Sequence, residues 1–307
     1  QTMRTAYMTR LWRARGTRST SLRMALNRDA LGFTTEPLLH EYRWQDIVLY
    51  NLAIGARRDH ELPLLFEGAD KQGPLVFPTY AVIPAWPAML KLFDAVGGDM
   101  LGIVHGAQSV TIHRPFAPAG RVFTTGRVAG VYDLKRLAQT TFVSETRDEA
   151  GQLLCETSWD IIFRLDGGFG GEKPPKAEKV RPPERDADFV VEESSSTEQA
   201  LLYRLTGDHN PLHADPAIGE KAGFGQPILH GLCTFGHVAR HVVNAACGGD
   251  PSRLRSLEGQ FRKPVWPGDT LVTSGWNEGD HLVIEMRTRE RPDDAPFSNA
   301  RAVIAPL

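Results

Sequence analysis

The chain repeats one pattern twice, and this duplication constrains its fold more than any other feature. In each half, a proline is followed 37 residues later by a second and three residues after that by a third: Pro78, Pro115 and Pro118, then Pro227, Pro264 and Pro267. The run Leu-Tyr-Asn-Leu at 49–52 likewise matches Leu-Tyr-Arg-Leu at 202–205. Any fold for this chain must therefore accommodate two diverged copies of one unit.

The boundary between the copies lies in residues 166–188, which are rich in Gly, Pro and charge and have almost nothing to bury. This composition predicts a linker that runs over the surface. It separates an N-terminal domain at 29–165 from a C-terminal domain at 189–307, and each is long enough to fold around its own core. Residues 1–28 form an arginine-rich N-terminal extension.

The C-terminal copy contains one long helix followed by strands. Apolar residues between 227 and 247 recur at steps of three and four, which predicts a helix with Pro227 in its first turn and Gly248 at its end. Runs typical of strands follow near 256–263, 269–276, 281–290 and 298–305, and in the first copy near 108–114, 120–132, 138–147 and 153–164. We expect an α+β fold in which each copy packs a helix against a curved antiparallel sheet, with the two sheets joined edge to edge.

The helix of the N-terminal copy is expected to differ from its counterpart. Residues 78–86 occupy its place, but Pro84 and Pro87 lie where a continuous helix needs N–H donors. Proline inside a helix is unfavourable by about 3 kcal/mol, so this helix is predicted to be short or broken. The sheet of the first copy would then be partly uncovered on its concave side.

Composition excludes several classes of partner. A formal net charge of −2 leaves no basic excess to neutralise phosphates, so we expect no nucleic-acid partner. No run approaches 18 apolar residues, so no membrane-spanning helix is expected. The three cysteines (Cys155, Cys233 and Cys247) have no paired spacing, which indicates thiols rather than a disulfide framework.

The extension at 1–28 carries seven arginines and no acidic residue, with Ser and Thr interspersed. This composition is typical of an organelle transit segment; the alternative is an upstream extension without a role, with the working start near Met24. The final residues, Ala-Pro-Leu, lack the basic residue of a Ser-Lys-Leu type of peroxisomal signal. A peroxisomal and a mitochondrial location both remain open.

The sharpest motif is Tyr-Arg-Leu-Thr-Gly-Asp-His-Asn-Pro-Leu-His-Ala-Asp at 203–215. Its Gly, Asp, Asn and Pro favour a loop, and such a loop can present Asp208 and His213 to one point. Hydration of an electron-poor alkene requires that one proton leave water and one reach the neighbouring carbon. A carboxylate and an imidazole that converge on one water suit both transfers near neutral pH.

A second signal lies downstream, where Gly231 is placed in the first turn of the expected helix. The first N–H groups of a helix have no partner within it and carry positive partial charge. Such a donor can stabilise the enolate oxygen that develops when water adds beta to a thioester carbonyl, and glycine lets the thioester approach closely.

These runs, with Gly-Phe-Gly-Gln-Pro-Ile-Leu-His-Gly-Leu at 223–232, resemble the hydratase 2 motif of the MaoC-like family. The resemblance extends from about residue 24 to the end and is strongest to the eukaryotic-type (R)-specific 2-enoyl-CoA hydratases. It implies a tandem double hot-dog fold and conversion of a trans-2-enoyl-CoA thioester to (3R)-3-hydroxyacyl-CoA in fatty acid β-oxidation. It also implies a homodimer and no metal or organic cofactor.

The resemblance assigns roles to matching positions. Asp208 and His213 become the pair that activates water and manages the proton. Asn210 supports that water, and the Gly231 amide is the oxyanion donor. All four motif positions carry the residue types of the family.

Further positions match residues that contact the acyl-CoA. These are His105, Gly106 and Phe261; Lys135 matches a CoA-contacting lysine only if the local alignment shifts by one residue. The first copy reads Leu-Tyr-Asn-Leu-Ala-Ile-Gly-Ala-Arg-Arg-Asp-His at 49–60, without the Asp-x-Asn-Pro-x-His set. The resemblance implies that this copy accommodates long acyl tails; the alternative is a purely structural half.

Simpler roles are open for some of these residues. Asp208 could cap a turn, and Asn210 could form an Asx-turn. His237 and His241 are four residues apart, as metal ligands on a helix can be, but no HExxH motif or cysteine pair accompanies them, so we expect no metal site. We expect these two histidines along one stripe of the central helix, and Cys233 as a structural thiol.

Two further functions remain as alternatives. One is a 3-hydroxyacyl dehydratase that acts on acyl-carrier-protein thioesters in organellar fatty acid synthesis, because the same chemistry serves both directions. The other is a non-catalytic acyl-CoA binding module, which the complete Asp, Asn and His set disfavours.

Overall fold

The computed structural model describes residues 26–68, 72–99, 102–176 and 178–306, so most of the arginine-rich extension lies outside the described residues. Its strands form one antiparallel ten-stranded sheet in the order β1-β3-β4-β5-β2-β7-β10-β9-β8-β6. The strands are β1 (Leu38–Tyr42), β2 (Ile103–Ile112), β3 (Gly120–Asp133), β4 (Ala138–Asp148), β5 (Leu153–Phe163), β6 (Phe189–Ser194), β7 (Leu254–Phe261), β8 (Thr270–Asn277), β9 (Leu282–Thr288) and β10 (Phe297–Ile304).

The sheet confirms the duplication. Read inward from its two edges, β1-β3-β4-β5-β2 of the first copy corresponds to β6-β8-β9-β10-β7 of the second. The copies meet where β2 pairs with β7, with Ala107 opposite Gln260 and Thr111 opposite Ser256. The expected edge-to-edge junction and the α+β double hot-dog fold are therefore confirmed. The edge strands β1 and β6 were not predicted.

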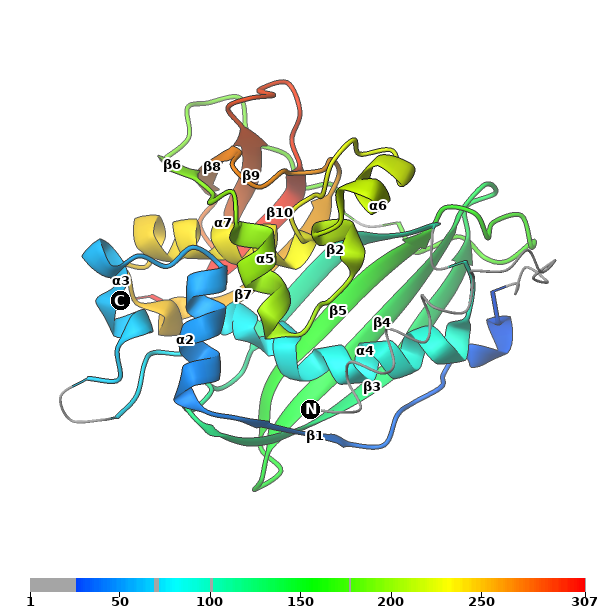
Figure 1. The fold of residues 1–307 in the computed structure, drawn as a ribbon, viewed down its shortest axis with the longest axis horizontal. Helices are drawn as coiled ribbons and strands as arrows, with labels where there is room; N and C mark the ends of the chain where they lie inside the picture. Colours follow the sequence, from blue (N-terminus) through cyan, green and yellow to red (C-terminus); the bar gives the residue numbers. More distant parts are fainter. Residues whose placement is uncertain (1–25, 69–71, 100–101, 177, 307) are drawn as a thin grey trace.

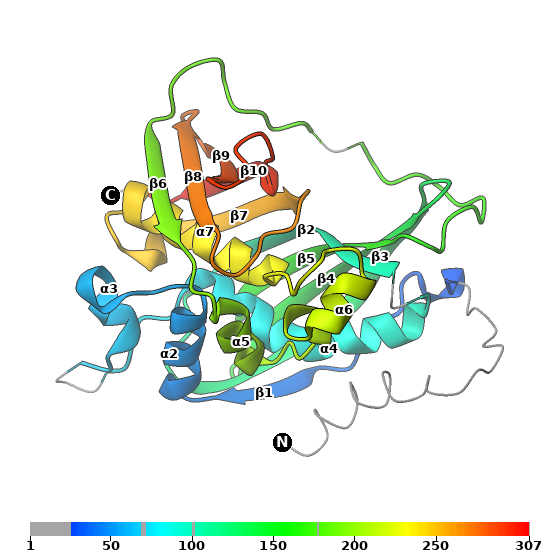
Figure 2. The ribbon, with the colours of Figure 1, turned by 45° about the horizontal axis from the view of Figure 1, so that its top comes forward.

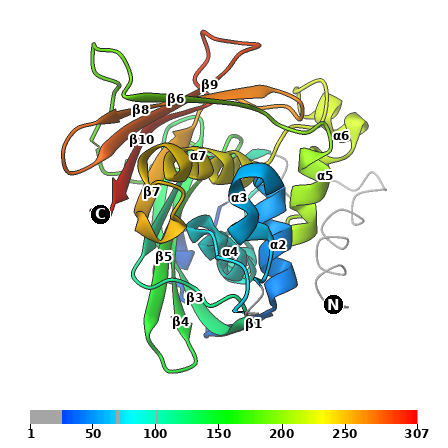
Figure 3. The same ribbon diagram turned by 90° about the vertical axis from the view of Figure 1, so that its left-hand side faces the viewer.

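Helices cover the concave side of this sheet. Figure 1 shows the long helix of the first copy crossing β3, β4 and β5, and Figure 3 shows that of the second copy lying between the β6–β8–β9–β10 layer and the N-terminal helices. Within the described residues, no helix is both long and apolar enough to span a bilayer. The α-helices are α2 (Trp44–Ala53), α3 (Arg58–Leu65), α4 (Val82–Val96), α5 (Gln199–Tyr203), α6 (Pro216–Lys221) and α7 (Gly231–Ala246). The 3-10 turns are η1 (Arg28–Ala30), η2 (Pro78–Ala81), η4 (Arg204–Thr206), η5 (Pro211–His213) and η6 (Pro251–Arg253).

The central helix α7 ends as predicted but begins later. Gly248 adopts a positive φ of 65°, and the Gly249 amide returns to the Val243 carbonyl, which is a glycine cap. The placement of Pro227 in the first turn was wrong. The Ile228 and Leu229 amides instead donate to the carbonyls of Leu212 and Val265, so the segment before α7 is tied to neighbouring loops rather than to a helix.

The prediction of a short or broken helix in the first copy was also wrong. α4 runs for 15 residues. Pro84 is its third residue and lies in the first turn, where the N–H groups have no intrahelical acceptor in any case. Only Pro87 is interior, and the packing of the buried face, which includes Met89 and Leu92, outweighs the one backbone bond it removes.

Hydrogen bonds hold the start of the segment that joins the copies in place. Figure 2 shows it running from the end of β5 around the sheet to β6. The Asp133 carboxylate accepts hydrogen bonds from the amides of Gly168 (3.0 Å) and Gly170 (2.6 Å), and these bonds lower the pKa of Asp133. The described residues of this segment form no helix or strand.

Candidate active site

A cavity of about 330 Å³ lies between the two copies. The reactive loop, the start of α7, the end of β7 and the start of β2 all contribute to its wall. Six of the residues singled out in the sequence line it together: His105, Asp208, Asn210, His213, Gly231 and Phe261. The fold thus brings residues as far apart as 105 and 261 around one space.

The loop that carries the motif is fixed by its own side chains. Asp208 Oδ1 accepts the Asn210 amide (3.1 Å), and Asn210 Oδ1 accepts the Leu212 amide (3.0 Å) at the start of η5. The capping and Asx-turn roles considered from the sequence are therefore real. Each bond uses one oxygen, so Oδ2 of Asp208 and Nδ2 of Asn210 remain for a ligand.

The ring of His213 is held in one orientation. Its Nδ1 lies 2.8 Å from the Ile228 carbonyl oxygen. A carbonyl accepts, so Nδ1 carries the proton and Nε2 is the acceptor in the neutral ring. Potential ligand atoms of Asp208, His213 and His230 lie within 4.8 Å of one another, which brings the predicted reactive pair together.

His230 was not predicted as part of this site. Its ring stacks on that of His213, with centroids 3.7 Å apart and planes 25° apart, and its Nε2 lies 3.3 Å from the Asp208 carbonyl oxygen. It therefore contacts both members of the pair and lines the same cavity. Its position directly before Gly231 in the motif was the available signal.

Burial decides the charge state of these rings. Burial lowers the pKa of His213, and the nearby Asp208 carboxylate partly offsets this shift. Burial lowers the pKa of His230 further, because the His213 ring adds to it. Both rings are therefore neutral at physiological pH, and His213 can accept a proton.

Gly231 opens α7 at the cavity wall, as the sequence predicted. Its amide is among the first N–H groups of the helix, which have no intrahelical acceptor and are free to bind an oxyanion. A Cβ built on Gly231 would lie 3.5 Å from the Phe261 ring. The absent side chain thus leaves a narrow space between the amide and Phe261.

His105 lies among aromatic rings in the cavity wall. It stacks on Trp159 with centroids 5.3 Å apart and an interplanar angle of 4°, and Phe261 lies 4.9 Å away. Burial lowers the pKa of His105 to about 4, so the ring is neutral. Its Nε2 is buried without a hydrogen-bond partner among the described residues.

The other two expected contact residues are not among those that line the cavity. A Cβ on Gly106 would meet Ile162, so this position is packed against the neighbouring strand β5. Lys135 lies in the turn between β3 and β4 with a positive φ of 70°, next to the glycines that open the linker.

The comparisons with known proteins agree with this geometry. A model of the MaoC like domain matches residues 178–295, and one of the MFE-2 hydratase 2 N-terminal domain matches residues 40–164. The 3-hydroxyacyl-thioester dehydratase Y of Mycobacterium tuberculosis is 36% identical to this chain, over 92% of the chain and 97% of that protein. The chain belongs to the MaoC-like hydratase 2 family.

Two further relatives support this membership. The peroxisomal enoyl-CoA hydratase 2 of Arabidopsis thaliana is 32% identical, over 82% of this chain and 87% of that protein. The crystal structure of a MaoC-like dehydratase from Phytophthora capsici superposes with a TM-score of 0.82 at 29% identity, covering 91% of this chain and 98% of that one. The similarity therefore spans both copies of this MaoC-like chain.

The first copy of this hydratase 2 chain gives the cavity an apolar wall that was not predicted residue by residue. Trp86 and Phe93 come from α4, Ile103 from β2, and Trp159 and Ile161 from β5. Trp86 and Trp159 contact each other with centroids 6.1 Å apart. The alternation of Trp159 and Ile161 along one strand face was the only sequence signal for this wall.

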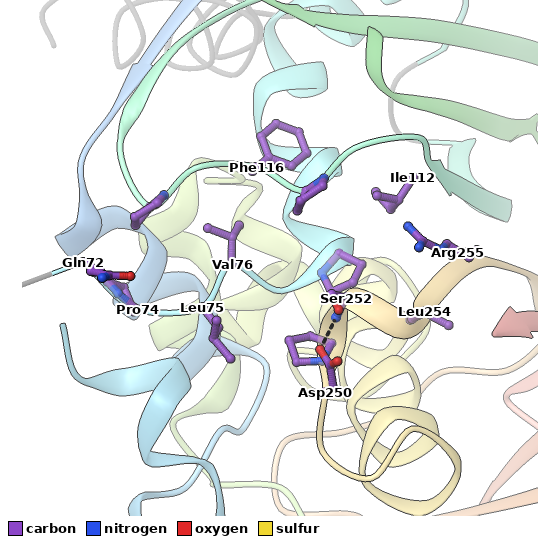
Figure 4. Close-up of a pocket in the computed structure, with 15 residues that line it drawn as sticks. Gln72, Pro74, Leu75, Val76, Ile112, Phe116, Asp250, Ser252, Leu254 and Arg255 are labelled. Carbon is purple, nitrogen blue, oxygen red and sulfur yellow. Dashed lines mark hydrogen bonds between the residues drawn. The ribbon is translucent and has the colours of Figure 1, made fainter. Parts of the chain in front are cut away.

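A second hollow, of about 210 Å³, lies at the other end of the junction between the copies, by the end of β2 and the start of β7. Figure 4 shows the apolar side chains of Val76, Ile112 and Phe116 on one part of its wall and Arg255 beside them. Asp250 lies at its rim and accepts a hydrogen bond from the Ser252 amide. None of the reactive residues of this family lines it.

Proposed function

We propose that this chain adds water reversibly to trans-2-enoyl-CoA and forms (3R)-3-hydroxyacyl-CoA in fatty acid β-oxidation. The observation that carries the proposal is the arrangement of Asp208 and His213 beside the free amide of Gly231, in one cavity. Each group in this set has the chemistry that one step of the reaction needs.

The steps follow from the geometry. The thioester oxygen accepts a hydrogen bond from the Gly231 amide. This bond stabilises the enolate that forms as the water oxygen bonds to the β carbon. Asp208 and His213 take one proton from this water and deliver a proton to the α carbon, so that water is added in full. Asn210 Nδ2 can hold the water oxygen, since its Oδ1 is engaged by the Leu212 amide.

The acyl tail extends from this point into the first copy. The wall of Trp86, Phe93, Ile103 and Ile161 offers apolar surface to the chain, and each methylene buried there contributes about 0.8 kcal/mol. The first copy therefore sets chain-length preference, although it lacks the reactive set.

A hydration assay tests this proposal. Four-, ten- and sixteen-carbon trans-2-enoyl-CoA substrates are supplied to the purified protein, and the product is resolved on a chiral phase with and without EDTA. We expect the 3R alcohol at a rate that EDTA leaves unchanged, because the chemistry uses no metal or organic cofactor. A 3S product would contradict the proposal. Rate loss in EDTA that zinc restores would show instead that a bound metal supports activity, without bearing on the stereochemistry. Binding of acyl-CoA without turnover would indicate a non-catalytic module.

A second candidate is dehydration of 3-hydroxyacyl groups on acyl carrier protein. The M. tuberculosis relative is named a 3-hydroxyacyl-thioester dehydratase, a name that does not specify the carrier. Comparison of kcat/KM for one acyl group on CoA and on acyl carrier protein separates the two. A preference for the carrier protein would favour the synthetic role.

The compartment and the assembly are part of the proposal. The Arabidopsis relative is named as peroxisomal, and we propose the same compartment here, with the mitochondrion as the alternative. We also propose a homodimer. Microscopy of the tagged full-length protein and light scattering during size-exclusion chromatography test these two statements, respectively.

A further inference from the structure

A second cluster of ionisable side chains lies away from the reaction cavity. Glu193 on β6 faces His237 and His241, which are one turn apart on α7, and the potential ligand atoms of the three lie within 4.8 Å of one another. Both imidazoles are fully buried. None of the three lines the reaction cavity, and the hydration chemistry has no use for them.

The spacing of this cluster suits a bound ion. Glu193 Oε2 lies 3.4 Å from His241 Nε2, and Glu193 Oε1 lies 3.8 Å from His237 Nδ1. Around a tetrahedral zinc ion with bonds of about 2.0–2.1 Å, neighbouring ligand atoms are roughly 3.3 Å apart. The rings of His237 and His241 are tilted by 65°, so their lone pairs can converge on one point. The rings of His213 and His230 in the reaction cavity are instead stacked, with planes 25° apart.

His237 is the member that calls for an explanation. Neither of its ring nitrogens makes a hydrogen bond with any described residue, although the ring is wholly inside the protein. A Cβ on Gly55 would lie 2.3 Å from this ring, so the turn between α2 and α3 is shaped around it. A buried polar group without a partner is unfavourable, and an absent ion is one of its known causes.

Neighbouring side chains contact the members of this cluster and fix their orientation. Thr273 Oγ1 lies 2.8 Å from His241 Nδ1, which leaves Nε2 to face Glu193. Arg240 holds the Oε2 oxygen of Glu193 and is itself paired through both oxygens of Glu61, at 2.9 and 2.7 Å. Glu61 balances the charge of Arg240, so a cation would compete for the charge of Glu193 mainly with the exposed Arg57. Metal ligands are commonly oriented by such hydrogen bonds.

We propose that Glu193, His237 and His241 bind one divalent ion of the zinc type. The ion ties the edge strand β6 to α7, the helix whose first residue is Gly231. Glu193 is 14% exposed at its side chain, and the exposed Arg57 lies at its outer edge, 3.7 Å from Oε1. This side gives the ion its route of entry, and the ion takes no part in the hydration step.

Metal binding to the whole protein tests the proposal. The protein is stripped with a chelator and dialysed against Zn²⁺ alone, and bound zinc is measured by mass spectrometry. His237→Phe and Glu193→Gln are the test variants, and His281→Ala, at a partly exposed histidine outside the cluster, is the matched control. Asp208→Asn reports whether zinc instead binds in the reaction cavity. Co²⁺ replaces Zn²⁺ in a parallel sample, where its visible spectrum reports tetrahedral nitrogen and oxygen ligands.

We expect one tightly held equivalent in the wild type, His281→Ala and Asp208→Asn, and none in His237→Phe or Glu193→Gln. His237→Phe is chosen because phenylalanine suits a buried ring without hydrogen bonds, so this variant should melt in chelator no earlier than the wild type. A wild type that retains no zinc and gives no tetrahedral cobalt spectrum overturns the proposal. So does an equivalent that survives His237→Phe or disappears with Asp208→Asn.

Discussion

The Nδ1 atom of His213 lies 2.8 Å from the carbonyl oxygen of Ile228, and this one contact decides which nitrogen faces the cavity. Ile228 belongs to the segment before α7 that was expected to be helical. Had that segment been helical, its carbonyl would have been directed along the helix. The late start of α7 thus puts the oxyanion donor Gly231 at the first position of the helix. It also leaves the Ile228 carbonyl free to fix the tautomer of His213.

Replacement of either member of the reactive pair should abolish hydration. Asp208→Asn and His213→Gln each remove a group that acts on the same water, and proton transfer by a positioned side chain is worth about 10²–10⁴-fold. We expect losses in this range, and little further loss in the double variant. Steady-state kinetics with the four-carbon substrate, alongside circular dichroism, measure this.

His209→Gln is the matched control for this pair. His209 lies in the same loop but is not among the residues that line the cavity. It should retain most of the activity. A reactive-pair variant that kept more than about a tenth of the rate, a change of only about 1.4 kcal/mol, would contradict the assigned role.

The rate should fall in acid because His213 must be neutral to accept a proton. Burial lowers the pKa of His213 from its ordinary value near 6.5, with Asp208 opposing part of the shift. The neutral form therefore dominates above about pH 6.5, and kcat/KM should decline only below that value. A pH profile with the four-carbon substrate checks this. A decline centred above pH 7 would show that the His213 pKa is raised instead.

Gly231→Ala should separate stability from activity. The added methyl meets Phe261 at an ordinary contact distance of 3.5 Å, and alanine suits a helix better than glycine by up to about 1 kcal/mol. Unfolding in urea should therefore show equal or greater stability. The methyl also occupies the space through which the thioester oxygen reaches the amide. We expect kcat to fall by up to about 10²-fold, the lower range for loss of an oxyanion donor. Full activity would place the oxyanion elsewhere.

Trp86→Ala should shift preference toward longer acyl chains. It enlarges the apolar wall in the first copy, so additional methylenes become buried at about 0.8 kcal/mol each. The ratio of kcat/KM for the sixteen-carbon substrate to that for the four-carbon substrate should rise about fourfold for each methylene accommodated. Trp44→Ala, a partly exposed tryptophan at the start of α2, is the control. An unchanged ratio would make the first copy a structural support alone.

Larger side chains at Ala81 and Ala85, near the start of the long helix of the first copy, would not fill this space. Both are fully buried core residues, and neither lines the cavity. A tryptophan there would overpack the core and destabilise the fold rather than block the tail.

Much of the fold could be predicted from the sequence, because hydrophobic periodicity and turn-forming residues such as Gly and Pro are local signals. The strands β3, β4, β5 and β8 begin and end within about two residues of their expected positions. The edge strands β1 and β6 were missed since each is short and gains its order from one neighbour. α4 was misjudged because a proline's effect depends on its place in the helix and on packing that the sequence does not display.

For the site, too, some features could be predicted from the sequence and others could not. Asp208, His213 and Gly231 lie in one dense motif, so their proximity could be predicted. The contact between His213 and His230 depends on how the segment before α7 is tied down, which is a tertiary feature. The wall of Trp86 and Trp159 brings a helix and a strand together from positions more than 70 residues apart, and no local pattern reports such a meeting.

The pairing of β2 with β7 within one polypeptide bears on how such an enzyme can evolve. In a dimer of identical subunits, any substitution that reshapes the tail wall also enters the subunit that carries the reactive loop. Here the wall at Trp86 and the loop at Asp208 are encoded separately. Selection can therefore remodel the range of substrates in one half while the chemistry in the other stays untouched.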